Sequence, residues 1–252
     1  MRSSSISLRL LFLVGVPVVG LAVLSWAVSS LPQTQRAGAA PASVSFLQCA
    51  NVGVVGGNCW TSASLSASNG SFAEGGSVPY RLAMSNLTEG THEIRISYDF
   101  TVGGRKAFDW VHDSFLLTPP CPVSALPGCP APGPSNRFAS AADDYLADGL
   151  MVWPAGGGAG TSVELYGGKI ESVSKPLHAG STDGDSPAAF NVTFRTCDSE
   201  VILMWNGRLA RSTYWNMANG GEPDGAKYLT SPARMRVEQL DGSPIGLELA
   251  LE

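Results

Sequence analysis

The sequence predicts a mainly β protein: an antiparallel β sandwich or jelly-roll-like single domain with a short helix and a Pro/Cys-rich loop insertion. The first observation is composition. Of 252 residues, 29 are Gly and 17 are Pro while only 15% are charged, which suits short strands and many turns better than long helices. The second is pattern, because short apolar or alternating segments recur between turn residues. A chain of this length can form one such domain.

Residues 1–42 have the layout of an export signal. Arg2 and Arg9 accompany an almost wholly apolar stretch, 10–28, and small residues suited to signal peptidase follow at 37–39 and 40–42. The stretch exceeds the roughly 7 to 15 residues of an ordinary signal core and nearly reaches the roughly 20 that span a bilayer. We therefore predict an export signal or signal anchor over 1–42. Residues 43–252 are then an extracellular or cell-surface β domain, anchored by 10–28 if the signal is not cut.

The predicted strands begin with the clearest one, 92–102, in which Ile94, Ile96 and Tyr98 alternate with polar residues. Residues 78–84 form a second strand, and the turn residues between the two predict an antiparallel hairpin. Turn signals separate the other expected strands. These are 162–166, 190–196, 201–205, 233–240 and the alternating leucines of 247–251.

Two further elements lie between these strands. Residues 118–135 are dense in Pro and contain two Cys, which predicts an ordered surface loop because Pro cannot donate to a ladder. Residues 137–150 predict the short helix, since Ala141, Ala142, Tyr145 and Leu146 are spaced to share one face.

The cysteines predict two local disulfides in an oxidising compartment. Cys49 would pair with Cys59 and Cys121 with Cys129, leaving Cys197 as a buried, inert thiol. A zinc site is not predicted, because the chain lacks a C-x-x-C pair and its three histidines lack metal-ligand spacing. We expect no cofactor. The Asp183-Gly184-Asp185 turn leaves a structural calcium ion open, although its spacing departs from the calcium-loop pattern.

Catalytic residues are not predicted. The chain has no G-x-S-x-G turn, and the adjacent His112 and Asp113 are more typical of a solvated surface pair than of an oriented base. Carboxylates that could act in pairs are present, but sequence places no two of them across a scissile bond. They are Asp99, Asp109, Asp143, Asp144 and Glu164.

Aromatic residues are the candidate ligand-binding groups. Trp60, Trp153 and Trp215 sit beside turn residues, and with Tyr214 they could stack on sugar rings. The alternative is that these tryptophans close the ends of the core, as most large aromatics do. Trp205 ends an apolar run and is predicted to be a core residue.

Two blocks of sequence resemble a family of uncharacterised secreted bacterial β-rich surface proteins with no assigned activity. The first block is Tyr98-Asp99-Phe100-Thr101 with Lys106-Ala107-Phe108-Asp109, similar to "Y-D-x-T" and "K-A-x-D". The second runs from Trp205-Asn206-Gly207-Arg208-Leu209-Ala210 to Ser231-Pro232-Ala233-Arg234-Met235-Arg236, similar to "W-G-G-H-I-A" and "S-P-Y-H-M-R". The resemblance covers most of 55–251 and implies an extracellular β domain.

This chain departs from that pattern at Arg208 and Arg234, where the two blocks usually carry His. If those histidines form a metal or acid/base pair in relatives, the site is lost here, because Arg neither binds metal nor titrates near neutrality. The alternative is that both positions are polar surface sites on neighbouring strands.

These observations predict a non-catalytic exported surface protein with a structural or adhesive role. The alternatives are a carbohydrate-binding module that uses the loop tryptophans, and an extracellular hydrolase. Expected partners are a cell-wall or extracellular polymer or another surface protein. With a net charge of -5 and scattered Lys and Arg, nucleic acid is not an expected partner. An exposed row of aromatics would favour sugar binding, and a pocket gathering Asp99, Asp109 or His112 would favour hydrolysis.

Overall fold

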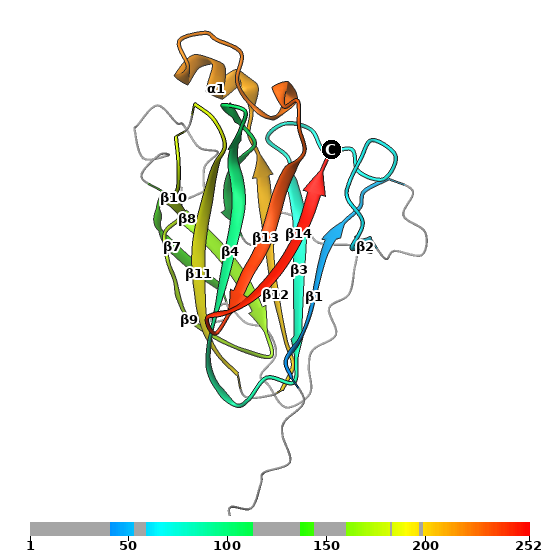
Figure 1. The fold of residues 1–252 in the computed structure, drawn as a ribbon, viewed down its shortest axis with the longest axis vertical. Helices are drawn as coiled ribbons and strands as arrows, with labels where there is room; N and C mark the ends of the chain where they lie inside the picture. Colours follow the sequence, from blue (N-terminus) through cyan, green and yellow to red (C-terminus); the bar gives the residue numbers. More distant parts are fainter. Residues whose placement is uncertain (1–40, 53–58, 113–136, 144–159, 182, 197–198) are drawn as a thin grey trace, which may run out of the picture. The chain divides into compact units, whose positions relative to one another are not determined.

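Two antiparallel sheets pack against each other and enclose the hydrophobic core (Figure 1). The computed structural model describes residues 41–52, 59–112, 137–143, 160–181, 183–196 and 199–252, all within one compact unit. Among these residues no helix has the length and apolar character needed to cross a membrane. The fold is therefore the mainly β sandwich that the sequence predicts.

Sheet I has the strand order β2-β1-β3-β12-β8-β7, and β6 also pairs with β12. Its strands are β1 (Ser43–Cys49), β2 (Trp60–Thr61), β3 (Ser77–Ser85), β6 (Phe108–His112), β7 (Arg137–Ala142), β8 (Gly160–Tyr166) and β12 (Val201–Leu209).

Sheet II has the order β10-β11-β4-β13-β14, with β5 paired to β4 and β9 paired to β11. Its strands are β4 (Gly90–Val102), β5 (Arg105–Lys106), β9 (Gly168–Val173), β10 (Leu177–His178), β11 (Ser186–Thr196), β13 (Ala233–Leu240) and β14 (Ser243–Leu251). The helix α1 (Ser212–Ala218) follows β12, and the 3-10 helix η3 (Ala226–Tyr228) precedes β13. Both helices lie beyond one end of the strands (Figure 1).

The core contains the inward side of both central strands. Ile94 and Ile96 of β4 have no exposed surface, as the alternation of that segment predicts. Opposite them, the fully buried Trp205 of β12 stacks on Phe46 and Tyr80, with ring centroids 5.6 and 5.9 Å away. The prediction that Trp205 belongs to the core is confirmed.

The predicted hairpin between 78–84 and 92–102 is wrong, although both strands form. β3 pairs with β1 and β12 in sheet I, whereas β4 pairs with β11 and β13 in sheet II. The turn between them crosses from one sheet to the other: Asn86 has a positive φ of 60°, and the buried Leu87 packs in the core. The alternation of apolar and polar residues indicates which face of a strand is buried, but it does not indicate which strand pairs with it.

The helix predicted over 137–150 is also wrong where the structure describes it. Residues Arg137–Ala142 form β7, which pairs with β8. The small residues of this segment are compatible with either a helix or an edge strand. Pairing with β8 favours the strand. Residues 144–150 lie outside the described residues, and the short helix is α1 instead.

The disulfide between Cys49 and Cys59 is present, as predicted, and joins the last residue of β1 to the residue before β2. A main-chain hydrogen bond of 2.8 Å from Ala50 to Cys59 closes the same turn. Cys121, Cys129 and Cys197 lie outside the described residues.

The segment around Asp183-Gly184-Asp185 forms a turn that packs on the β4–β5 connection. The Asp185 carboxylate accepts the Gly103 N–H at 2.7 Å, and the Gly184 carbonyl accepts the Thr101 hydroxyl at 2.8 Å. Gly104 has a φ of +74°, and a Cβ there would meet the Asp183 carbonyl oxygen at 2.7 Å. These hydrogen bonds use the turn's oxygens for folding, and in the described residues no three His, Cys, Asp or Glu side chains gather as a metal site.

His92 links β4 to the β13–β14 turn, and its geometry predicts a pH-dependent stability. The two ring nitrogens face acceptors, the Asp241 carboxylate at 2.7 Å and the Thr88 carbonyl at 2.8 Å, so a doubly protonated ring satisfies both. Burial lowers the pKa of His92, but these hydrogen bonds and the Asp241 charge outweigh burial and raise it above 6.5. The stability from this group is present below that pH and is lost as pH rises through the raised value.

We expect the urea midpoint of unfolding to fall between about pH 6 and about pH 9 because His92 then loses its charge. Asp241→Asn is the matched variant, since Asn also tolerates the positive φ of 51° at this turn and keeps an acceptor for the Glu93 N–H. An equal fall in Asp241→Asn would show that His92 is not responsible.

Candidate functional site

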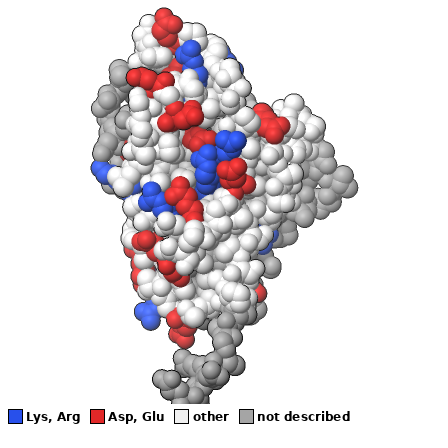
Figure 2. Space-filling model, viewed as in Figure 1, with Lys and Arg blue, Asp and Glu red and all other residues white. Residues whose placement is uncertain are grey.

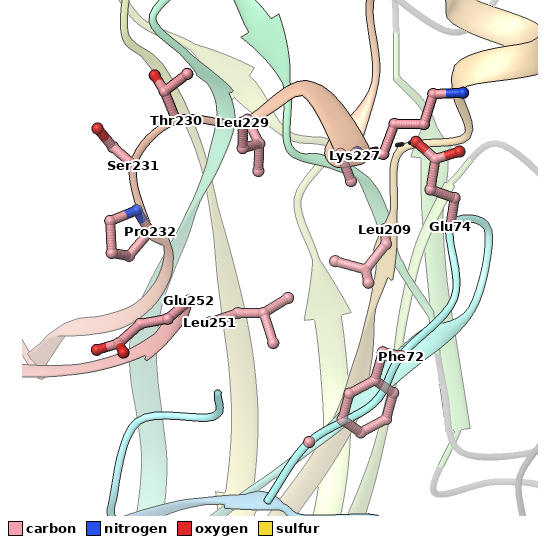
Figure 3. A pocket seen from close by; sticks show the side chains of 12 residues that line it. Phe72, Glu74, Leu209, Lys227, Leu229, Thr230, Ser231, Pro232, Leu251 and Glu252 are labelled. Atoms are coloured by element: carbon pink, nitrogen blue, oxygen red, sulfur yellow. Dashed lines mark hydrogen bonds between the residues drawn. The ribbon is translucent and has the colours of Figure 1, made fainter. Parts of the chain in front are cut away.

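A pocket of about 510 Å³ opens between the loop after Gly70, the η3 segment and the end of β14 (Figure 3). Its size lies within the range of small-ligand sites, roughly 300 to 1,000 Å³. The side chains of Leu209, Leu229 and Leu251 converge there beside Phe72 (Figure 3). The polar side chains at the pocket are those of Glu74, Lys227, Thr230, Ser231 and Glu252.

The ends of several strands fix the walls of this pocket. Leu209 ends β12 and exchanges hydrogen bonds with the 70–76 loop, from its N–H to the Gly76 carbonyl at 2.8 Å and from the Gly75 N–H to its carbonyl at 2.9 Å. Leu251 ends β14 and forms a parallel bridge with Leu65, a residue with no exposed surface. The ends of the two sheets therefore form one side of the pocket. η3 and the residues after it form the remaining wall.

Glu74 holds that wall in place. Its carboxylate accepts the Ser212 hydroxyl at 2.6 Å and the Lys227 N–H at 2.9 Å, so it joins α1 and η3 to the 70–76 loop. The Lys227 ammonium points away from the cavity in Figure 3 and lies 4.9 Å from the Tyr228 ring. The Glu252 carboxylate also points away from the cavity in Figure 3, so the side chains that face its interior are mainly apolar, and the Glu74 carboxylate is engaged in structural hydrogen bonds. Such a site can bind an apolar group, but it presents no acid and base on opposite sides of one.

A buried charged cluster lies at the same end of the fold, beneath α1. We call it the Asp109 cluster: Asp109 of β6, Arg208 of β12 and Trp215 of α1. The Asp109 carboxylate is 1% exposed and accepts hydrogen bonds from the Arg208 guanidinium and the Trp215 indole N–H. Burial raises the pKa of Asp109 to about 7, while Arg208 and Trp215 act in the opposite direction.

Neighbouring groups extend this cluster. Arg208 stacks on Trp110 at 4.1 Å from the ring centroid, and burial lowers its pKa while Asp109 opposes that shift. Lys106 lies 5.2 Å from the Trp215 ring centroid and 3.7 Å from the Asp224 carboxylate. Asp224 in turn accepts the main-chain N–H groups of Lys106 and Gly225, each at 2.7 Å. Each of these charges has an opposite charge nearby, which is the condition for keeping charges inside a fold.

A second buried pair joins Asp143 to His178 at 2.8 Å, with side chains 1% and 5% exposed. The His178 ring meets Phe100 edge-on at a centroid distance of 4.4 Å. Burial raises the pKa of the Tyr98 hydroxyl, and the charges of Asp143 and Asp109 add to the effect. The sequence contains no signal for this pair, because its members are 35 residues apart and β10 is only two residues long.

The carboxylates considered for catalysis lie in different parts of the fold. Asp109 and Asp143 are inside, near Tyr98. Asp99 pairs with Arg236 on sheet II at 2.6 Å, and Glu164 of β8 is buried. Asp109 and Asp143 therefore both act on Tyr98 from inside the fold, each with its own partner, whereas Asp99 lies on sheet II. Asp113 and Asp144 lie outside the described residues, as does the side chain of His112.

The predicted aromatic ligand groups occupy separate places. Trp215 is 7% exposed and packs in the core, while Tyr214 is half-buried with its ring edge-on to Trp215 at 5.5 Å. Trp60 lies in β2, half-buried against the Cys49–Cys59 disulfide. β2 and α1 stand well apart in Figure 1, so these rings do not form one row. Trp153 lies outside the described residues.

Arg208 and Arg234 are not on neighbouring strands, which corrects the sequence interpretation. Arg208 belongs to β12 in sheet I, and Arg234 belongs to β13 in sheet II. Arg208 is paired inside the fold, whereas the Arg234 side chain is 43% exposed and lies 3.5 Å from Glu248. The two arginines therefore do not mark one shared site.

The outer face of sheet II carries charges of both signs. Arg95 pairs with Glu238 at 2.7 Å, and Glu248 lies 3.5 Å from both Arg234 and Arg236. Figure 2 shows Lys and Arg interspersed with Asp and Glu on this face. Such mixing gives no single-sign field there to attract a charged polymer.

Comparison with known proteins finds no matching family model, no matching curated protein and no matching solved structure. The resemblance to secreted bacterial surface proteins therefore stays a prediction from the two sequence blocks.

Proposed function

We propose that this chain is a non-catalytic exported surface protein with an adhesive role, and that its pocket receives an apolar group from an extracellular partner. The observation that carries the proposal is the convergence of Leu209, Leu229 and Leu251 in an open pocket of about 510 Å³. Apolar surface of this kind marks binding sites, since burial stabilises by roughly 25 cal/mol per Å² of apolar surface removed from water.

The charges near the pocket support binding rather than chemistry. Of the two carboxylate side chains that line it, Glu74 accepts hydrogen bonds from Ser212 and Lys227, and Glu252 points away from the cavity (Figure 3). Asp109 is engaged by Arg208 and Trp215 inside the fold. Groups committed to structural hydrogen bonds are poorly placed to transfer protons to a ligand.

Export and adhesion are consistent with the rest of the chain. The N-terminal pattern of residues 1–42 is that of an export signal or anchor. The Cys49–Cys59 disulfide suits an oxidising compartment. The partner would be a cell-wall or extracellular polymer, or another surface protein. Stacking of sugars on Trp215 is less favoured because that ring is a core residue.

The test is retention of the full chain, produced by a host that exports it, on whole cell walls, cellulose, chitin and immobilised extracellular proteins. Leu229→Glu places a charge in the pocket and should weaken retention by roughly tenfold or more, since an unpaired charge or polar group is costly to bury. Leu177→Glu is the matched control, because Leu177 is an aliphatic residue 61% exposed on β10, away from the pocket.

Equal retention of Leu229→Glu and the unmodified chain would contradict the pocket as the contact. Retention that survives Leu229→Glu but is lost in Trp60→Ala would indicate sugar stacking instead. If none of the materials retains the chain, the adhesive proposal is wrong.

A further inference from the structure

We infer that the buried carboxylate of Asp109 makes the attachment of α1, and with it the η3 wall of the pocket, dependent on pH, so that the wall is held firmly in acidic medium and released as pH rises. This inference concerns regulation of the pocket and rests on the function proposed for it. Its physical basis is a titratable group that fastens a short helix to the sheets.

The first step is the attachment itself. Asp109 lies on β6 and is 1% exposed, and the Trp215 indole N–H reaches its carboxylate from α1. α1 has seven residues and no side-chain N-cap hydrogen bond, so a helix this short depends on tertiary contacts. Moving α1 away from β6 would admit water to Asp109.

The second step connects α1 to the pocket. Ser212, the first residue of α1, donates to Glu74 at 2.6 Å, and Glu74 accepts the Lys227 N–H of η3 at 2.9 Å. The Asn216 side chain of α1 also accepts the Asp224 N–H at 2.7 Å. The pocket wall therefore shares its hydrogen bonds with α1, and release of the helix loosens both.

Four residues on the elements packed against Asp109 carry charged side chains: Lys106, Arg208, Arg211 and Asp224. Arg208 of β12 pairs with Asp109, and the main chain of Arg211 donates to it. The charge of Asp224 acts against the ionised form of Asp109, and Lys106 of β5 lies beside Asp224 and offsets that charge.

The uncharged titratable neighbours are two phenols. Tyr98 of β4 is fully buried near Asp109, and burial raises its pKa far above neutrality. Burial likewise raises the pKa of Tyr214 in α1 to about 12. Both stay protonated through the neutral range. The Asp143–His178 pair also lies nearby, since Phe100 meets both His178 and Trp215 edge-on, and Asp109→Asn separates its effect from that of Asp109.

The sign follows from comparing the closed and open states. Burial raises the pKa of Asp109 from 3.8 to about 7 in the closed state, and exposure to water would return it toward 3.8. The closed state thus binds more protons between these values, and opening becomes more favourable as pH rises, by at most about tenfold per pH unit. Above about pH 7 the effect levels off. When Asp109 is neutral, the Arg208 charge is still stabilised by the Trp110 ring and by contact with water, since its side chain is 13% exposed.

The test is amide hydrogen exchange of the full chain at pH 5, 6, 7 and 8, corrected for the intrinsic exchange rate. The opening constants of the amides in α1 and of Lys227 should rise roughly tenfold to a hundredfold between pH 5 and pH 7 and by only about twofold between pH 7 and pH 8. Asp109→Asn should abolish the dependence, and Asp183→Asn, at an exposed turn, should leave it intact. A wild-type chain without the dependence, or an Asp109→Asn chain that keeps it, would overturn the inference.

A second measurement covers the case in which Asp109→Asn does not fold. The Trp215 indole N–H resonance of the unmodified chain, assigned with Trp215→Phe, should titrate with a midpoint near pH 7, because it donates to Asp109. A flat profile between pH 5 and pH 8 would equally overturn the inference. Neither readout involves a ligand, so failure of the adhesive proposal and failure of the pH dependence are distinguishable.

Discussion

Trp205→Ala is expected to lower the free energy of unfolding by about 3 to 5 kcal/mol, as measured by urea denaturation. The side chain has no exposed surface and stacks on Phe46 and Tyr80, which come from two other strands of sheet I. Removing it leaves a cavity between rings that are fixed by strand pairing, and a rigid cavity is the costly kind.

Trp205→Phe is the matched variant for this prediction. It keeps an aromatic ring in the stack and removes an indole N–H that has no hydrogen-bond acceptor in the described part of the chain. The cost should fall to about 1.5 kcal/mol or less. A loss under about 1 kcal/mol in Trp205→Ala would show that the core collapses to fill the space.

Arg208→Met is expected to cost about 3 to 5 kcal/mol at pH 8, because it leaves the Asp109 carboxylate buried without its cation. The loss should be smaller at pH 5. Burial already raises the pKa of Asp109 to about 7, and removal of Arg208 raises it further, so at pH 5 the group is neutral and needs no counter-charge.

The double variant Arg208→Met with Asp109→Asn tests the same explanation. It removes both charges and should recover most of the stability lost at pH 8. Arg95→Met is the control, because the Arg95 side chain is 37% exposed in its pair with Glu238 and water can replace it. A loss for Arg208→Met that is equal at pH 5 and pH 8 would exclude the buried carboxylate as its cause.

The strands could be predicted from sequence because each has a locally encoded face. The alternation at Ile94, Ile96 and Tyr98 marks β4, and the bounds predicted for 233–240 agree with β13. Strand partners are not encoded locally. The turn after β3 contains ordinary hairpin residues, yet β4 lies in the other sheet, because its edges are filled by β11 and β13.

Most contacts of the candidate site could not be predicted from sequence for the same reason, since their partners are far apart along the chain. Asp109 could be recognised as a carboxylate, but its partners Arg208 and Trp215 lie 99 and 106 residues further along the chain. The pocket leucines come from the ends of two strands and from the segment after η3, and none of those segments has a binding motif. The Cys49–Cys59 disulfide was predictable because its loop is short enough for proximity to be local.

The position of β4 in the middle of sheet II has a consequence for how the chain acquires its structure. Both of its long partners, β11 and β13, belong to the last third of the sequence. The same is true of β12, one of the two partners of β3. Such long-range pairing makes folding slow, on the order of milliseconds to seconds. During synthesis β3 can already pair with β1, but β4 has neither β11 nor β13 until the last third of the chain has been made. The two sheets can therefore close on each other only when nearly the whole chain is present.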